Sequence, residues 1–321
     1  MKKYAFFVFV LIAGVLLSSC AAKEEVAVEV LPTNTPEPTE IPRLMPGEPP
    51  EAERTLEDVD SSIKAEEKRA ITGDNILDNL YERPFTSEEM VYQPDLNILT
   101  VAFASDENFF YYTIALEDLD SDSGTLTGTY GVEFDRTQSG RGDLLAWVKN
   151  PSAQWSVDGV TVYDDPNGVV GGVKPIVAEE GFEGMGYQNT LELVEDQVAW
   201  ARIAPDDPSA VQIAVSRALL GNVEEFLWGA WADGGVQDPG LFDYDDHFGP
   251  SAAGSPIKTD PDYPVKALFS LDNTCRLPYG FDQMASSIPG MCITSKPSET
   301  CECTFWVNLG ATRVCVNWEC H

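Results

Sequence analysis

Acidic side chains with regular spacing are the first candidates for chemistry in this chain. Asp118, Asp120 and Asp122 stand at alternate positions of a short loop, and a glycine follows them. Carboxylate oxygens at this spacing can converge on one Ca²⁺ ion, while the glycine permits the turn. The loop departs from an EF-hand, because Ser123 takes the glycine position and Thr129 replaces the bidentate glutamate. A solvated acidic loop explains the same residues, so both interpretations remain open.

A second acidic cluster, residues 243–247, has the same status. Asp243 and Asp245 are its alternate carboxylates and the second candidate calcium ligands. Calcium is therefore the only candidate cofactor that the sequence indicates.

Catalytic motifs are few. Histidine occurs only at His247 and His321, and no Gly-x-Ser-x-Gly segment presents a nucleophile. Paired carboxylates for glycoside hydrolysis cannot be selected among 53 acidic residues. The sequence therefore predicts a binding protein rather than an enzyme.

The cysteines indicate an oxidising compartment. Apart from Cys20, all of them fall near the C-terminus, and an even, clustered set in an exported chain is typical of disulfides. Zinc is the competing interpretation, but no Cys-x-x-Cys pair occurs and histidines are scarce. The six predicted disulfide cysteines are Cys275, Cys292, Cys301, Cys303, Cys315 and Cys320.

The net charge excludes one class of partner. The chain carries a formal charge of −33, which repels phosphate backbones, so nucleic acid is not expected as a partner. The charge also repels an anionic membrane surface. Attachment to a membrane would therefore have to rest on acyl chains.

Short apolar and aromatic segments separated by turn residues predict an all-β fold. They lack the alternation with helices that a parallel sheet requires, so we expect an antiparallel β-sandwich over residues 75–265. The predicted strands are 97–104, 108–116, 128–135, 143–149, 154–163, 198–203, 210–215 and 226–231.

Two flanking regions differ from the sandwich in composition. Residues 20–74 begin with a Pro-, Glu- and Thr-rich stretch that cannot pack a core and predicts a disordered tether, with a short marginal helix within 55–70. Residues 266–321 contain the clustered cysteines and predict a small disulfide-rich module that docks on the sandwich.

The N-terminus predicts export. Lys2 and Lys3 precede an apolar run too short to span a bilayer comfortably. The run ends in Leu17-Ser18-Ser19-Cys20, which resembles the lipobox of bacterial lipoproteins. The resemblance implies cleavage after residue 19 and diacylglyceryl attachment to Cys20; an ordinary secretory signal is the alternative.

The sandwich also carries a resemblance. The segment PDLNILTVAFASDENFFYYTIAL, the strand YGVEFD, the segment WSVDG and the strand VQIAV with a following Leu-Leu-Gly turn are similar to carbohydrate-binding family 9 and DOMON-like domains. Asp95 matches the aspartate that opens an early strand, whereas Gln212 stands where an acidic residue is usual. The match covers roughly residues 92–232 and consists of core patterning.

This resemblance implies sugar or haem binding, and the scarcity of histidine disfavours haem. Sugar binding needs an aromatic face beside polar groups. Trp155, near a turn, and Trp228 or Trp231 are the predicted contacts; the last two are three apart, so on one strand they face opposite sides. Core packing is the alternative for each. The aromatic candidates are Trp147, Trp155, Trp200, Trp228 and Trp231.

Together these features predict an extracytoplasmic protein that is held to a bacterial membrane by an acyl anchor and exposed on the cell surface. Its predicted function is glycan binding, with calcium as a candidate aid. The alternatives are a structural or adhesive protein that binds cell-surface proteins and, with less support, a glycoside-active surface enzyme.

Overall fold

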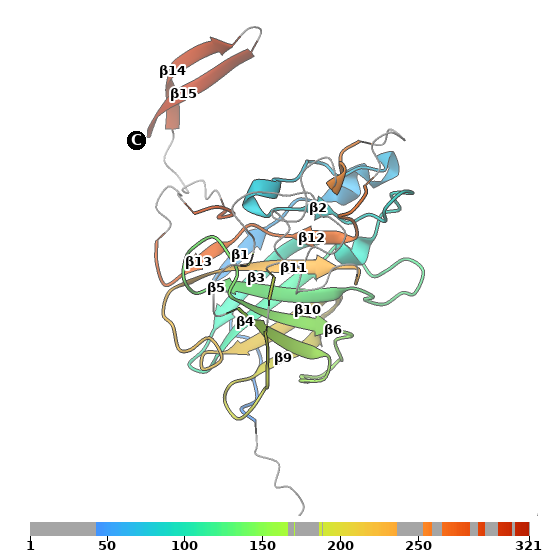
Figure 1. Cartoon of the computed structure of the whole chain (residues 1–321), viewed down its shortest axis with the longest axis vertical. Coiled ribbons are helices and arrows are strands. Elements are labelled where there is room, and N and C mark those ends of the chain that lie inside the picture. Colours follow the sequence, from blue (N-terminus) through green and yellow to red (C-terminus); the bar gives the residue numbers. More distant parts are fainter. Residues whose placement is uncertain are drawn as a thin grey trace, which may run out of the picture. The chain divides into compact units, whose positions relative to one another are not determined.

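A computed structural model describes residues 43–165, 170, 186–187, 189–235, 253–258, 265–282 and 288–292, together with the backbone of 301–309 and 312–320. Within these residues the predicted all-β class is confirmed: two antiparallel sheets form a sandwich (Figure 1).

The smaller sheet has five strands in the order β1-β3-β4-β10-β9. The predicted strands 97–104 and 108–116 are confirmed and pair with each other as a hairpin, with Val101 opposite Ile114. Asp106 shapes its turn, because its Oδ1 accepts hydrogen bonds from the backbone N–H groups of Asn108 and Phe109, both at 2.7 Å. The strands are β1 (Arg54–Glu57), β3 (Ile98–Ser105), β4 (Phe109–Leu116), β9 (Ala199–Ala204) and β10 (Asp207–Ser216).

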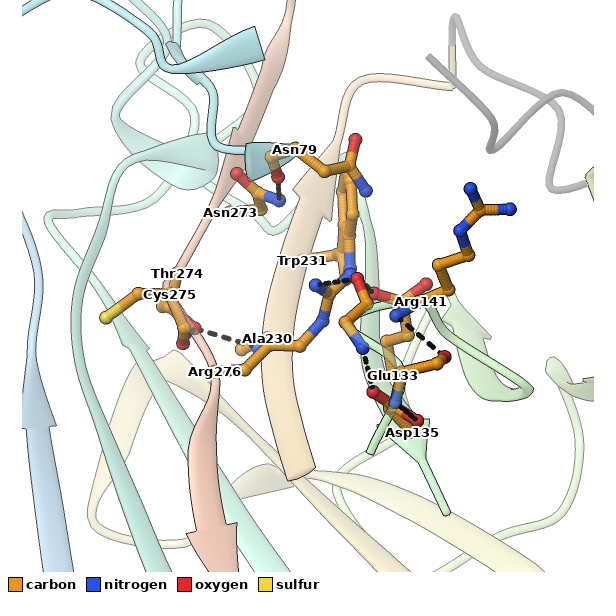
Figure 2. A network of polar contacts seen from close by, with 12 residues as sticks. Asn79, Glu133, Asp135, Arg141, Ala230, Trp231, Asn273, Thr274, Cys275 and Arg276 are labelled. Atoms are coloured by element: carbon orange, nitrogen blue, oxygen red, sulfur yellow. Dashed lines mark hydrogen bonds and ion pairs between the residues drawn. The ribbon is translucent and has the colours of Figure 1, made fainter. Parts of the chain in front are cut away.

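The larger sheet has the order β2-β12-β11-β5-β6-β7-β8, and β13 also pairs with β11. β12 and β13 follow one another along β11, with Trp231 opposite Asn273 and Trp228 opposite Leu277. Between them the Thr274 hydroxyl accepts a hydrogen bond from the Ala230 N–H at 3.0 Å (Figure 2). The strands are β2 (Glu82–Arg83), β5 (Thr129–Asp135), β6 (Leu144–Lys149), β7 (Val160–Asp164), β8 (Asn189–Leu191), β11 (Phe226–Asp233), β12 (Leu271–Asn273) and β13 (Leu277–Tyr279).

The main core lies between the two sheets. Tyr112 of the small sheet packs edge-on against Trp228 of the large sheet, with ring centroids 5.0 Å apart, and Phe103 stacks on the same indole at 5.5 Å. Alternate residues of β5, such as Val132, point into this core. Buried aromatic rings of this size supply much of the stabilisation of a sandwich.

The other face of the large sheet is also covered. Trp231, Leu145 and Leu271 form a second apolar cluster there with Tyr81, which precedes β2. The side chains on both faces of β5 and β11 are consequently buried. This double covering explains why β11 lacks an alternating polar face, whereas the polar residues of β5, Thr129, Glu133 and Asp135, are themselves buried.

Two predicted boundaries of the sandwich are wrong. β1 lies within 20–74 but pairs with β3, and a 3₁₀ helix, η1 (Ser61–Glu67), occupies the region of the predicted marginal helix. The folded part therefore includes residues assigned to the tether. At the other end, β12 and β13 belong to the large sheet although they lie within the predicted cysteine module.

The last two strands pair with each other as a two-stranded sheet. β14 (Cys301–Leu309) pairs antiparallel with β15 (Thr312–Cys320), with Cys301 opposite Cys320 in the backbone register. Two further 3₁₀ turns, η2 (Ile76–Asp78) and η3 (Pro94–Leu96), complete the elements.

Candidate functional site

A cavity of about 480 Å³ opens beside β2 and β12 of the large sheet. Four of its lining residues are acidic, and others offer amide or hydroxyl groups. No lysine, arginine or histidine is among the described residues that line it. The lining residues are Glu57, Asp58, Val59, Thr72, Gly73, Asp74, Asn75, Leu80, Tyr81, Glu82, Asn273 and Cys275.

Polar side chains join the two walls of the cavity. The Asn273 Oδ1 accepts a hydrogen bond from the Tyr81 N–H at 2.7 Å, and its Nδ2 donates to the Asn79 carbonyl at 2.8 Å (Figure 2). Asn79 adopts the left-handed conformation with φ 57°, which asparagine tolerates better than most residues, and so turns the chain from η2 into β2. Residues about 190 positions apart are thereby held at one site.

Arg83 anchors the loop behind the cavity. Its Nη2 pairs with Asp74 Oδ2 at 2.5 Å, and its Nη1 donates to the carbonyls of Ala253 and Leu268 at 2.6 and 2.7 Å. Both charged side chains of this pair are buried. The positive charge of Arg83 is therefore already committed to Asp74 and to backbone oxygens.

Three buried carboxyl groups near the cavity lack such a partner. Asp58 Oδ2, Glu82 Oε1 and Asp272 Oδ1 are buried and accept no hydrogen bond in the structure. Glu82 is only 5% exposed and Asp272 is 0% exposed. The second oxygen of Asp272 accepts a hydrogen bond from the Ile98 N–H at 2.7 Å, which fixes the carboxyl at the sheet edge.

The electrostatic environment favours the protonated forms of these acids. Burial raises the pKa of Asp58 to about 7, against a backbone hydrogen bond at Val59. Burial raises the pKa of Glu82 to about 8; a hydrogen bond with Ser61 opposes the rise, and the charges of nearby aspartates add to it. The pKa of Asp272 is raised well above its ordinary value, first by burial and then by Glu82 and Asp58.

A second polar network surrounds Glu133 of β5 (Figure 2). Glu133 accepts hydrogen bonds from Arg276 Nη2 at 2.9 Å, Trp231 Nε1 at 3.3 Å and the Tyr187 hydroxyl at 2.9 Å. Glu133 and Arg276 are both buried. The Glu133 carboxylate is thus paired with Arg276 and accepts two further hydrogen bonds. We interpret the network as a structural link between strands and not as a ligand site.

The structure gives the predicted tryptophans different roles. Trp228 is 0% exposed in the inter-sheet core, and Trp231 is 1% exposed on the opposite face of β11. The prediction that they face opposite sides is confirmed. As placed, neither indole presents a face to a sugar, because side chains cover both faces of the sheet.

Trp155, the predicted sugar contact near a turn, is partly exposed. The Arg202 guanidinium lies over its ring, 4.4 Å from the centroid, and its Nε1 donates to the Gly47 carbonyl at 3.0 Å. Trp200 similarly donates to the Leu44 carbonyl at 2.9 Å. We call residues 43–50, which cross this face of the small sheet, the strap. The strap occupies the polar edge of Trp155, so the indole is less open than the sequence predicts.

The candidate calcium loop is closed by its own hydrogen bonds. Asp120 Oδ1 accepts a hydrogen bond from the Ser123 N–H at 2.8 Å, and Asp118 Oδ1 accepts one from Leu119. Across the described part of the chain, no group of three or more His, Cys, Asp or Glu residues is arranged to hold a metal ion. The structure does not bring Asp118, Asp120 and Asp122 together as a metal site. Asp243 and Asp245 lie outside the described residues.

The cysteine predictions have separate outcomes. Cys275 and Cys292 form a disulfide, and Cys275 lines the cavity. The side chains of Cys301, Cys303, Cys315 and Cys320 lie outside the described part, as does Cys20, so their bonding and lipidation remain predictions. No helix among the described residues is long and apolar enough to cross a membrane.

Sequence reasoning missed the cavity. Its walls come from the predicted tether, residues 57–74, from the start of the predicted sandwich, residues 75–82, and from the predicted cysteine module, residues 273–275. The one available signal was the mixture of acids with apolar residues in 56–60, which a disordered tether does not need.

Known proteins do not extend these observations. Comparison with family models, curated proteins and solved structures finds no match. The resemblance to carbohydrate-binding family 9 and DOMON-like domains therefore rests on the sequence motifs alone. Asp95, which carries part of it, is buried and accepts hydrogen bonds from the Thr127 N–H and hydroxyl at 2.9 and 2.7 Å, a role in holding the fold.

Proposed function

We propose that this chain is an extracytoplasmic, lipid-anchored binding protein that captures a glycan in the cavity beside β2 and β12. The observation that carries the proposal is the cavity itself, whose volume of about 480 Å³ lies in the range of small-molecule sites. Glu82 Oε1 and Asp58 Oδ2 are buried acceptors without donors. Sugar hydroxyls are donors, and pairing a buried acceptor recovers a cost of about 1–3 kcal/mol per group.

The glycan assignment draws on three supports of different kinds. The sandwich motifs are similar to those of carbohydrate-binding domains. Asn75 and Thr72 add amide and hydroxyl groups to the acidic wall, which is the mixture that sugar hydroxyls require. The lipobox-like segment before Cys20 supports an extracytoplasmic location, where a protein would meet extracellular glycans.

A glycan array probed with the purified full-length protein tests this function. We expect binding to a restricted set of glycans, with the hits confirmed by titration calorimetry. An array and titrations without binding at millimolar sugar would contradict the proposal. The anchor is tested separately by Cys20→Ser, which should move the protein from the membrane fraction to the medium.

A glycoside-cleaving activity is the second candidate, and one observation favours it. Asp58 and Glu82 are neighbouring carboxyls with raised pKa values in one cavity, as a general acid requires. If the array hits are hydrolysed, reducing ends should accumulate and Glu82→Gln should stop their release. Binding without release of reducing ends would exclude this activity for those glycans.

A further inference from the structure

The cavity has a surplus of acidic groups that no basic group of the described residues pairs with, and a bound cation would favour their ionised forms. Glu57, Asp58, Asp74 and Glu82 line it, and Asp272 lies behind it close enough to act on Glu82 and Asp58. The basic group packed against these acids is Arg83, which is committed to Asp74. Asp58, Glu82 and Asp272 have no ion-pair partner among the described residues.

Burial makes this surplus costly. Glu82 is 5% exposed, it lines the cavity, and its Oε1 has no hydrogen-bond donor. A buried carboxylate without a counter-charge is strongly unfavourable unless it takes up a proton or meets a cation. A cationic ligand would remove the cost by supplying both the charge and the donors.

The arrangement suits an organic cation better than a metal ion. Calcium needs several oxygens at about 2.3–2.6 Å from one point, and no three acidic groups of the described part are grouped in that way. An ammonium group instead donates three hydrogen bonds in different directions. It can therefore reach acceptors that belong to separate elements, such as Asp58 after β1 and Glu82 in β2.

We infer that the glycan bound in this cavity is an amino sugar with a free ammonium group, held by Glu82 and Asp58. This inference rests on the proposed function and narrows its ligand class. The hydroxyls of the sugar face the amide and hydroxyl groups of Asn75 and Thr72 on the same wall. An N-acetylated sugar lacks the charge, so it leaves the carboxyls unpaired and binds less tightly.

Titration calorimetry with the full-length protein at pH 6.5 tests the inference. The probes are fully de-N-acetylated and fully N-acetylated glucosamine tetramers of equal length. We expect the de-N-acetylated tetramer to bind at least tenfold more tightly, with the preference falling as salt is added. Equal affinities, or tighter binding of the acetylated form, would overturn the inference while leaving glycan binding intact.

A variant pair assigns the preference to the cavity. Glu82→Gln should reduce the preference at least tenfold, whereas Glu88→Gln, the same change at an exposed residue, should leave it unchanged. Circular dichroism and thermal melting establish that both variants fold. An unchanged preference in folded Glu82→Gln would contradict the assignment to this site.

A simple amine separates the inference from the proposed function. If ethanolamine binds as tightly as the amino-sugar tetramer, the cavity recognises cations but the glycan proposal fails. If neither tetramer nor the amine binds, both fail.

Discussion

Arg83 directs two of its nitrogens at one oxygen of Asp74, with Nε and Nη2 lying 3.0 and 2.5 Å from Oδ2. This bond pairs Arg83 with Asp74, and Glu82, the residue before Arg83, has no ion-pair partner among the described residues. The two residues of β2 therefore differ in their hydrogen bonding. Every guanidinium nitrogen of Arg83 donates a hydrogen bond, whereas Glu82 Oε1 accepts none.

The unpaired carboxyls predict an unusual dependence of stability on pH. The raised pKa values of Asp58, Glu82 and Asp272 mean that the folded state holds more protons than the unfolded state above about pH 4. Their contribution to the free energy of unfolding is therefore full below pH 4 and is lost as pH rises through about 7 to 8. Asp74 and Asp60 are the other charged groups that act on Glu82, and Arg83 is paired with Asp74.

Asp272→Asn tests this dependence. It removes a buried ionisable group that the fold favours in its protonated form, while its amide oxygen can still accept from Ile98, so we expect a gain of about 1–3 kcal/mol in unfolding free energy at pH 8 and a smaller gain at pH 5. Thermal or urea unfolding at both pH values gives the result. A loss of stability at pH 8 would show that the carboxylate has a cationic partner.

In the buried Glu133–Arg276 pair, loss of a charged group should lower the free energy of unfolding, unlike the loss of Asp272. Arg276→Met leaves Glu133 buried without its counter-charge, and we expect a loss of about 3–5 kcal/mol. The double variant Glu133→Gln with Arg276→Met should recover much of that loss. Urea unfolding of the three proteins forms the cycle, and independent, additive losses would mean that the two groups do not interact.

The strap depends on Arg202, which binds both carboxylate oxygens of Glu48, at 2.9 Å and 2.5 Å, and stacks on Trp155. Arg202→Ala should loosen residues 43–50 and make them the first site of limited proteolysis. Glu48→Ala should have a smaller effect, because its side chain is 76% exposed and such ion pairs contribute about 1 kcal/mol or less. Unchanged cleavage in Arg202→Ala would show that the strap is held by its backbone contacts.

The Cys275–Cys292 disulfide ties the cavity wall to the segment beyond β13. It closes a loop with a sequence separation of 17 residues, for which the loss of chain entropy predicts about 3 kcal/mol of stabilisation. Replacement of both cysteines by alanine should lower the free energy of unfolding by that amount and weaken ligand binding, since Cys275 lines the cavity. Denaturant unfolding and titration of one array hit measure the two effects.

The central strands could be predicted because their composition matches their surroundings. β4 and β11 are runs of aromatic and aliphatic residues, and the structure buries them in the sandwich. β2 and β12 were missed because they are short and polar: Glu82, Arg83 and Asp272 are buried only through partners distant in sequence. Local patterning carries no signal for such long-range pairing.

The candidate site was less accessible to sequence reasoning for a related reason. The parity of Trp228 and Trp231 on a strand predicted their opposite faces correctly. Their exposure could not be predicted from the sequence. The layer that covers Trp231 includes Tyr81, whose ring centroid lies 6.2 Å from that of the indole. Tyr81 lies close to the predicted boundary between tether and sandwich, where no core residue was expected. The acidic residues of the cavity could not be singled out, because the sequence contains 53 acidic residues and none of the four has a distinctive spacing.

The most direct test of the account is whether filling the cavity abolishes glycan binding. Thr72 lines the cavity and is an exposed residue, so Thr72→Trp should fill part of the cavity volume. Thr190→Trp places the same bulk on an exposed position of β8. For an array hit titrated by calorimetry, the account predicts at least a tenfold loss of affinity in Thr72→Trp and wild-type affinity in Thr190→Trp. Wild-type affinity in folded Thr72→Trp would contradict the claim that this cavity is the binding site.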